Sequence, residues 1–394
     1  MSTTDTDVVG AITLTDDELD PYVTHAGTRQ WLTGPGVPSD STLLGFDTLR
    51  EHGLRRVADL VGHADELAQE LRDQLVVGAL RTFDRDLEPI VLDGATGEIA
   101  TTYFYSEPSL MDLAPLAPSL EALVRFAVAT EELTAFHGRF ASPEGRFGPK
   151  AVTEASAALT AVFEAGAGDA LAPYWRMAAL IRPLARIAGP GEGLVLDLPK
   201  RLLDEEFGAG AIMRFEDVDF PPALVHEPTR RFLRETGLPE DGLLFHLDTE
   251  VPLPALTEYY ADERPDDFSA DALPATADRL IRLGPLLEDT SLVVDGTTGA
   301  VLTWSEPDMI LRPLNADIST LAFTLWLLHR EQTIDAAHDF TDSYEQLAAI
   351  MAHTLATVDP LACDPTPAPA VPGDDGWRYW PEIFEDQAGG TLQA

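Results

Sequence analysis

Two histidines and two glutamates recur at matching places in the two halves of this chain, and their side chains are the ones best suited to chemistry. His25 and His226 each stand three residues before a Thr-Arg pair, and Glu107 and Glu306 each stand in a Ser-Glu-Pro triplet. Histidine exchanges protons near neutral pH, and a carboxylate can act as a general acid or base. Each pair could therefore serve catalysis or serve the fold.

Catalysis needs partner groups, and the sequence shows none in a known arrangement. The nine histidines form no HExxH metal motif, and neither a GxSxG motif nor a phosphate-binding P-loop motif occurs. Both repeated histidines directly precede a predicted helix, so we interpret them as capping or core residues. We predict no enzyme, no catalytic residue, no cofactor and no metal site. A hydrolase that uses Glu107 or Glu306 is an alternative, which loss of turnover in Glu306→Gln would support.

The recurrence extends over both halves of the chain. The segment His25–Asp40 aligns without a gap with His226–Asp241, and seven of the sixteen positions are identical. Collinear matches over a whole half indicate a duplicated domain, because a solenoid repeat has a much shorter period. Further matches follow in the same order: Val91–Glu98 with Val293–Ala300, and Tyr174-Trp175 with Tyr379-Trp380.

The predicted domains cover residues 1–190 and 194–394, and the glycine-rich segment Gly189–Gly193 lies at the boundary. The 394 residues of the chain suit two units of ordinary domain size. With 45% hydrophobic residues, each unit can bury a core of normal size.

Cysteine usage and hydropathy indicate the cellular compartment. The single cysteine, Cys363, excludes an internal disulfide and a cysteine-based metal cluster. No run of 18 apolar residues occurs, and the N-terminus lacks the regions of a signal peptide. We therefore expect a cytoplasmic protein with no membrane partner.

The charge balance is strongly acidic. The 67 acidic and 26 basic residues give a formal net charge of −41 at pH 7. Such a chain repels nucleic acid and anionic membranes and attracts a basic protein. We therefore predict no direct binding of nucleic acid. Whether the acidity serves a partner, or reflects solubility or a bias of the whole proteome, stays open, because net charge says nothing about the fold.

Strand and helix signals occur in the same order in both halves. An Asp-Gly pair and a later glycine supply the positive φ values of a tight hairpin loop, at Asp93–Gly97 and Asp295–Gly299. An amphipathic helix follows behind a capping residue, Ser119 or Asp317. This order predicts an α+β fold with a mostly antiparallel sheet and helices packed against it. The predicted strands beside the loops are Ile90–Leu92, Glu98–Tyr105, Leu292–Val294 and Ala300–Trp304.

Four segments of the second half carry a family resemblance. They are RFEDVDFPPALVHEPTRRFLRETGLPED from Arg214, VVDGTTGAV from Val293, LNADISTLAFTLWLL from Leu314 and WRYWPEIFEDQ from Trp377. Together they resemble the fourth subfamily of the SUKH superfamily of immunity proteins. The first half resembles this subfamily more weakly, and Ala117 stands there at the position of Asn315.

The resemblance implies two tandem SUKH-like domains, each a curved, mostly antiparallel sheet flanked by helices, without catalysis. It implies an immunity protein that binds and neutralises a toxin domain of a polymorphic toxin system, often a nuclease or a nucleic-acid deaminase. The acidity suits this role, because a domain that acts on nucleic acid presents a basic cleft that an acidic protein can cover. A non-catalytic scaffold or regulatory protein of the same fold, which binds an endogenous partner, is the alternative.

Duplication leaves three arrangements open for the two copies. They bind two toxins, they clamp one toxin together, or one copy has become a structural support. The second copy matches the family better, so we expect it to be the active one.

The residues that follow the second hairpin are our predicted contact with the partner: Trp304, Glu306 and Asp308. An exposed aromatic ring beside carboxylates suits a basic partner. The alternative is that Trp304 belongs to the core and that the two acids are solvated. The aromatic residues near the C-terminus are interpreted as packing anchors: Trp377, Tyr379 and Trp380.

Overall fold

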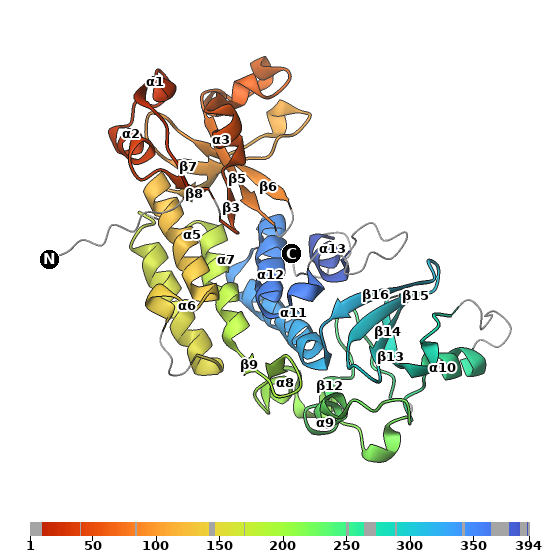
Figure 1. The fold of residues 1–394 in the computed structure, drawn as a ribbon. Helices are drawn as coiled ribbons and strands as arrows, with labels where there is room; N and C mark the ends of the chain where they lie inside the picture. Colours follow the sequence, from red (N-terminus) through yellow and green to blue (C-terminus); the bar gives the residue numbers. More distant parts are fainter. Residues whose placement is uncertain are drawn as a thin grey trace. The chain divides into compact units, whose positions relative to one another are not determined.

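The chain forms two compact α+β units (Figure 1), which confirms the predicted fold class. The computed structural model describes residues 10–39, 41–82, 85–141, 146–168, 170–249, 252–263, 273–287, 290–340, 343–363, 378–386 and 392. The predicted domain division between residues 190 and 194 stays a prediction. Unit 1 comprises Met1–Ser142, Thr153–Pro183 and Glu345–Ile350, and unit 2 comprises Pro143–Val152, Leu184–Tyr344 and Met351–Ala394.

The sheet of unit 1 is antiparallel throughout its described pairings. Its strands are ordered β3 (Leu44–Gly45), β5 (Leu75–Arg81), β6 (Asp86–Leu92), β7 (Ile99–Thr101) and β8 (Ala114–Ala117), and β4 (Arg55–Arg56) also pairs with β5. The strand predicted to run to Tyr105 ends at Thr101. Both neighbouring strands pair in register with β7 only as far as Thr101, and beyond it the Thr102 amide still donates to the Pro89 carbonyl of β6 at 3.2 Å.

Helices cover one face of this sheet. Helix α5 (Leu120–Thr134) begins behind Ser119, whose side chain accepts a hydrogen bond from the Ala122 amide at 3.2 Å, so the predicted cap is confirmed. Helices α6 (Pro149–Glu164) and α7 (Pro173–Ile181) pack beside α5 (Figure 1). The rings that join the three helices, with centroids 5.1 to 5.4 Å apart, are Phe126, Phe163 and Trp175.

The other face of the sheet of unit 1 has its own apolar cluster, built from short helices and turns between β4 and β5. This segment includes α4 (Gln69–Arg72) and two 3-10 turns. Apolar side chains from it pack on the sheet and remove that face from water. The buried members of the cluster are Val57, Leu67, Leu71, Val76, Val91 and Met111.

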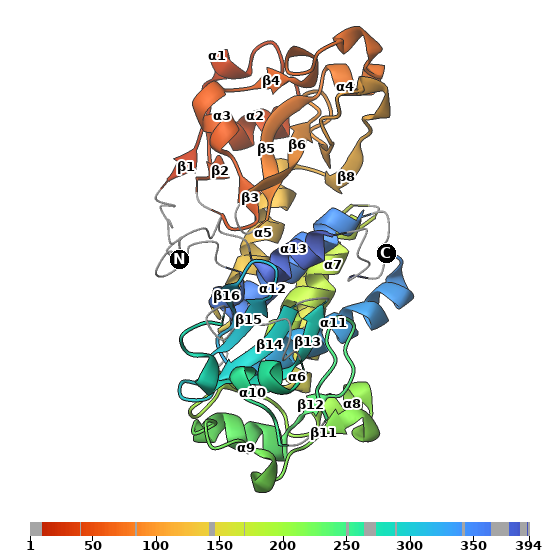
Figure 2. The ribbon, with the colours of Figure 1, turned by 90° about the vertical axis from the view of Figure 1, so that its right-hand side faces the viewer.

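The sheet of unit 2 is a four-stranded antiparallel meander (Figure 2). Its strands are β13 (Leu280–Leu287), β14 (Thr290–Asp295), β15 (Val301–Ser305) and β16 (Ile310–Asn315), in that order. Helix α10 (Leu256–Glu263) packs on one face, where Leu256 and Tyr260 lie against strand residues. The helices that follow this sheet in the chain are α11 (Ile318–His338), capped by Asp317 as predicted, α12 (Tyr344–Val358) and α13 (Tyr379–Glu385).

A short strand pair recurs beside the helix that follows the repeated histidine in each copy. In the first copy β1 (Ala11–Ile12) pairs with β2 (Val37–Pro38), and in the second β11 (Ile212–Met213) pairs with β12 (Leu238–Pro239). The helices between them are α2 (Ala26–Thr33) and α9 (Glu227–Glu235), and the smaller elements are α1 (Asp16–Leu19), α3 (Asp47–His52), α8 (Leu202–Phe207), β9 (Gly189–Pro190) and β10 (Leu196–Asp197).

The two motifs that recur in the sequence contact each other in both units. The repeated histidine and the residue before it both donate their backbone N–H groups to one carbonyl of the hairpin loop. The acceptor is Gly94, at 2.8 and 2.9 Å, in the first copy and Gly296, at 2.8 Å twice, in the second. The hairpin is thereby fixed to the N-terminus of α2 in the first copy and of α9 in the second, and we call this contact the loop–helix brace.

The histidine side chains complete the brace. His25 Nδ1 lies 2.9 Å from the Thr28 hydroxyl and accepts from the Thr28 amide at 3.3 Å, so its predicted capping role is confirmed. His226 makes the same 2.9 Å contact with Thr229 but no capping hydrogen bond to a backbone amide. Both rings lie over the last glycine of the hairpin loop, where an added Cβ would come within 2.3 Å of Nδ1. The repeated histidines therefore serve the fold.

A buried polar cluster forms at the end of β16, around Asn315, the single asparagine of the chain. Its side-chain NH₂ group donates to Thr324 at 3.2 Å and to Asp359 at 3.0 Å, and its carbonyl accepts from the Trp380 indole at 3.0 Å. Asp359 also accepts from the Ala316 amide at 2.9 Å. This cluster ties β16, α11 and α13 together, because each member supplies the partner that another needs.

The first copy has no asparagine at this place, and its buried tryptophan indole finds another acceptor. Ala117 replaces it, and the Trp175 indole donates instead to the Leu116 carbonyl at 3.0 Å. Trp175 and Trp380 are both fully buried and each stands edge-on to the preceding tyrosine. These contacts support the interpretation of the repeated aromatic pair as packing anchors, and Trp377 lies outside the described residues.

Alanine at Gly97 tests the loop–helix brace. We expect Gly97→Ala to lower the free energy of unfolding by about 3 kcal/mol, because the new methyl group meets the His25 ring and left-handed backbone strains an L side chain. Gly168→Ala is the control, because Gly168 also has a positive φ, of 70°, but an added Cβ meets nothing within 4 Å. We expect the control to lose about 1 kcal/mol. Equal losses in urea unfolding would show that the ring contact contributes nothing.

Removing the Asn315 amide tests the polar cluster. We expect Asn315→Ala to lower the free energy of unfolding by about 3 kcal/mol, because the Trp380 indole and the Asp359 carboxylate each lose a buried partner. Urea unfolding followed by tryptophan fluorescence measures the loss. A change below about 0.5 kcal/mol, the usual range of a surface substitution, would contradict this account.

Candidate functional site

Trp304, the aromatic residue of the predicted contact surface, lies in the core. It is 1% exposed and packs with Leu256, Tyr260 and Val293. Its indole N–H donates to the Tyr260 hydroxyl at 3.1 Å. The expectation of an exposed ring at this position is therefore wrong, and the physical reason is α10, which covers this face of the sheet.

Glu306 is half-buried, and its carboxylate is held by a hydrogen bond from a core tyrosine. The Tyr260 hydroxyl, which accepts from Trp304, donates to Glu306 Oε1 at 2.7 Å. Burial, and then the hydrogen bond to Glu306, raise the pKa of Tyr260 well above its ordinary value, so its phenol stays protonated and keeps donating. The buried tryptophan thus positions a carboxylate at the surface through one tyrosine.

Asp308 is exposed at the tip of the turn between β15 and β16. Its carboxylate accepts from the Ser305 hydroxyl at 3.0 Å and lies 3.5 Å from an Arg312 nitrogen. Next to it, Met309 is 60% exposed and has a positive φ of 53°. We call Glu306, Pro307, Asp308 and Met309 the turn surface.

Met309 is the residue of the turn surface that sequence reasoning missed. Residues other than glycine seldom adopt left-handed backbone, so an exposed apolar side chain at such a position is uncommon. The corresponding place in the first copy, three residues after Glu107, holds Leu110, which is 61% exposed. The signal was present in the sequence as an apolar residue inside an otherwise polar Ser-Glu-Pro turn. Glu107 itself is exposed and accepts from Ser109 at 3.1 Å.

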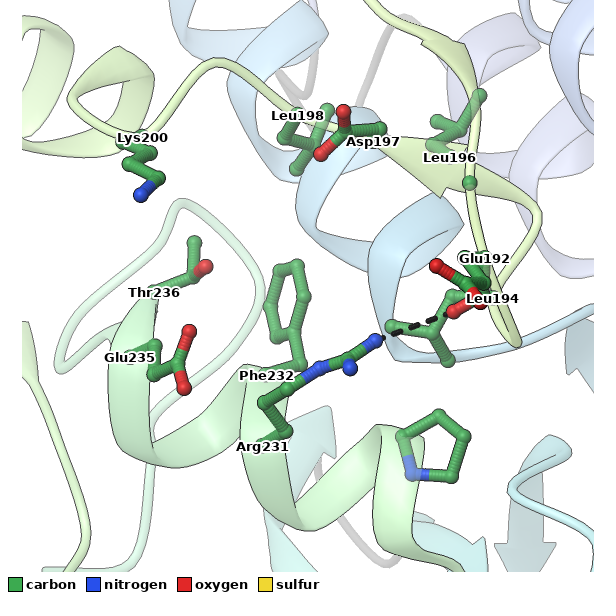
Figure 3. A pocket seen from close by; sticks show the side chains of 12 residues that line it. Glu192, Leu194, Leu196, Asp197, Leu198, Lys200, Arg231, Phe232, Glu235 and Thr236 are labelled. Carbon is green, nitrogen blue, oxygen red and sulfur yellow. Dashed lines mark hydrogen bonds between the residues drawn. The ribbon is translucent and has the colours of Figure 1, made fainter.

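A pocket of about 370 Å³ lies in unit 2 between α9 and the segment around β10 (Figure 3). Figure 3 shows side chains of both charge signs around it, and Arg231 donates to the Glu192 carbonyl at 3.1 Å. Since both cations and anions line its walls, the pocket favours no ligand of one charge. Its charged lining residues are Glu192, Asp197, Lys200, Arg231 and Glu235.

A larger groove of about 760 Å³ lies in unit 1 along β8, and we call it the β8 groove. Its acidic lining residues are Glu70, Asp93 and Glu98, and none of the described residues that line it is cationic. Its size is that of a site for a small ligand or a short peptide segment. The apolar lining comes mainly from β8 and from the connection between α6 and α7, and includes Leu113, Pro115, Leu116, Phe126 and Leu171.

The remaining candidates for chemistry are structural or lack a partner. In the part of the chain that the structure describes, no group of three His, Cys, Asp or Glu side chains is placed to hold a metal ion. Cys363 is buried, its thiol contacts the Ala352 carbonyl, and burial raises its pKa. Across the same described ranges, no helix combines the length and the apolar character needed to cross a membrane.

Comparison with known proteins gives one family. The family model of the SUKH-4 immunity protein matches residues 6–163 and, a second time, residues 198–386. No curated protein and no solved structure matches the chain significantly. The two matched regions confirm the resemblance seen in the sequence of both halves. Because they make up most of its length, the chain belongs to the SUKH-4 immunity protein family.

Proposed function

We propose that this protein neutralises the toxin domain of a polymorphic toxin by covering a basic active cleft, without turning over a substrate. The observation that carries the proposal is the net charge of −41 on a member of an immunity family. A nuclease or nucleic-acid deaminase must attract phosphates, so its cleft is cationic and attracts an acidic protein equally well. Such an inhibitor acts in the cytoplasm, where the nucleic acid lies, with domains at residues 1–190 and 194–394.

The turn surface is our proposed contact of the second copy. Glu306 accepts a hydrogen bond from Tyr260, Asp308 is exposed, and Met309 adds an exposed apolar side chain next to Asp308 in the chain. A rigid carboxylate loses little conformational freedom on binding a cation, and an exposed apolar side chain can fill a pocket on the partner. Trp304 supports this surface from the core and takes no direct part in the contact.

Tagged protein should recover a basic toxin domain from a lysate of the source cells. We expect the captured domain to be released as the salt concentration rises, because exposed charges are screened. Asp308→Lys should weaken capture about tenfold, mainly through slower association. Asp278→Lys is the matched control, because Asp278 is an exposed aspartate of the same unit outside the turn surface. Recovery of endogenous cytosolic proteins alone would favour a scaffold.

Glycine at Met309 separates binding from stability. We expect Met309→Gly to leave the free energy of unfolding within about 1 kcal/mol, because relief of the left-handed backbone offsets the greater freedom of the unfolded chain. Loss of the side chain should weaken toxin binding about tenfold, as for an apolar anchor. Val218→Ala, at a residue 80% exposed elsewhere, should leave binding unchanged. Equal binding of Met309→Gly and the unmodified protein in titration calorimetry would remove Met309 from the contact.

A further inference from the structure

The two copies differ at one carboxylate that both possess. The aspartate of each hairpin loop uses Oδ1 to accept two backbone amides of the loop: at 2.8 and 2.9 Å for Asp93, and at 2.9 and 3.0 Å for Asp295. In the second copy the other oxygen of Asp295 forms an ion pair with Arg279 at 3.0 Å. Asp295 is thereby satisfied within its own chain.

Strand register identifies the residue that corresponds to Arg279. Leu75 pairs with Leu92, and Ile281 pairs with Val294, in each case one residue before the loop aspartate. Counting two residues back from Leu75 gives Asp73, whereas the same step from Ile281 gives Arg279. An acid therefore stands in the first copy where the second copy supplies the cation.

The first copy also adds negative charge around this carboxylate. Glu98, which lines the β8 groove, is exposed and stands at the position of Ala300 in the second copy. Glu70 lies on the same groove, and no cation pairs with Asp93 among the described residues. Three carboxylates therefore line a groove whose other lining residues are apolar apart from Gln74, and a cation that binds there gains from all three.

We propose that the β8 groove binds an arginine-centred, otherwise apolar segment of the toxin, whose guanidinium takes the place that Arg279 occupies in the second copy. This assignment rests on the proposed function and deepens it by naming the partner's chemistry. The fork of donors on a guanidinium fits paired carboxylate oxygens, and the flanking side chains pack on Leu113, Leu116 and Leu171. Residues 1–9 and 387–394 do not supply this guanidinium, because they contain no arginine.

The test uses the full chain and a defined peptide, N-acetyl-Leu-Arg-Leu-amide, titrated into isotope-labelled protein and followed by amide chemical shifts. We expect saturable shifts confined to the groove, and an affinity about tenfold lower for the peptide with neutral citrulline in place of arginine. Asp73→Arg recreates the cation of the second copy, so it should weaken peptide binding about tenfold as well. Glu51→Arg, the same charge change at an exposed residue of α3, should bind as the unmodified protein does.

Three results would overturn the assignment: equal binding of the citrulline peptide, unchanged binding by Asp73→Arg, or shifts scattered over the acidic surface. The amide spectrum would show whether Asp73→Arg folds. If it does not, Glu98→Ala is the substitute variant: it introduces the residue that the second copy has at this position, Ala300, and should weaken peptide binding. The peptide assay needs no toxin. If the peptide binds but the lysate capture recovers no toxin, the β8 groove stands as a binding site and toxin neutralisation is contradicted. If a toxin is captured and its binding is unchanged by Asp73→Arg, toxin neutralisation stands and the role of the groove is contradicted.

Discussion

The loop–helix brace is the contact on which each unit depends. One carbonyl of the hairpin loop accepts hydrogen bonds from two backbone N–H groups at the N-terminus of α2 or α9, so the helix and the sheet cannot move apart without exposing three polar groups. Because these donors and acceptors are backbone atoms, the brace constrains few side chains. The histidine, the threonine beneath it and the glycine against the ring are the residues it does constrain.

Local features of the fold were predictable from sequence, because their causes lie within a few residues. Ser119 and Asp317 cap their helices as expected, since a cap and its helix are contiguous in the chain. The strand after Glu98 was predicted too long, because its end depends on where two other strands stop pairing. Trp304 could not be placed from its neighbours in sequence, because its burial depends on α10, more than forty residues earlier.

The candidate sites depend even more on residues that lie far apart in the sequence, so less of them could be predicted. Glu306 was identified from the repeated Ser-Glu-Pro triplet and Asp308 as a second acid after the hairpin, and both lie on the turn between β15 and β16. The β8 groove escaped sequence reasoning, because Glu70 and Asp93 meet there only after β5 and β6 have paired. What distinguishes the two copies is likewise the residue at one equivalent position of the sheet register, Asp73 in the first and Arg279 in the second, which no linear motif displays.

The ion pair between Arg279 and Asp295 has a consequence for how a duplicated binder acquires new targets. A cation tethered beside its carboxylate is present at an effective concentration on the order of millimolar or higher, far above that of a cellular protein. It therefore acts as a built-in competitor that keeps the site occupied. Exchange of this one side chain opens or closes a binding site while the brace and the core stay intact. After duplication, one copy can retain the arginine that occupies its carboxylate while the other copy, without it, acquires new binding partners.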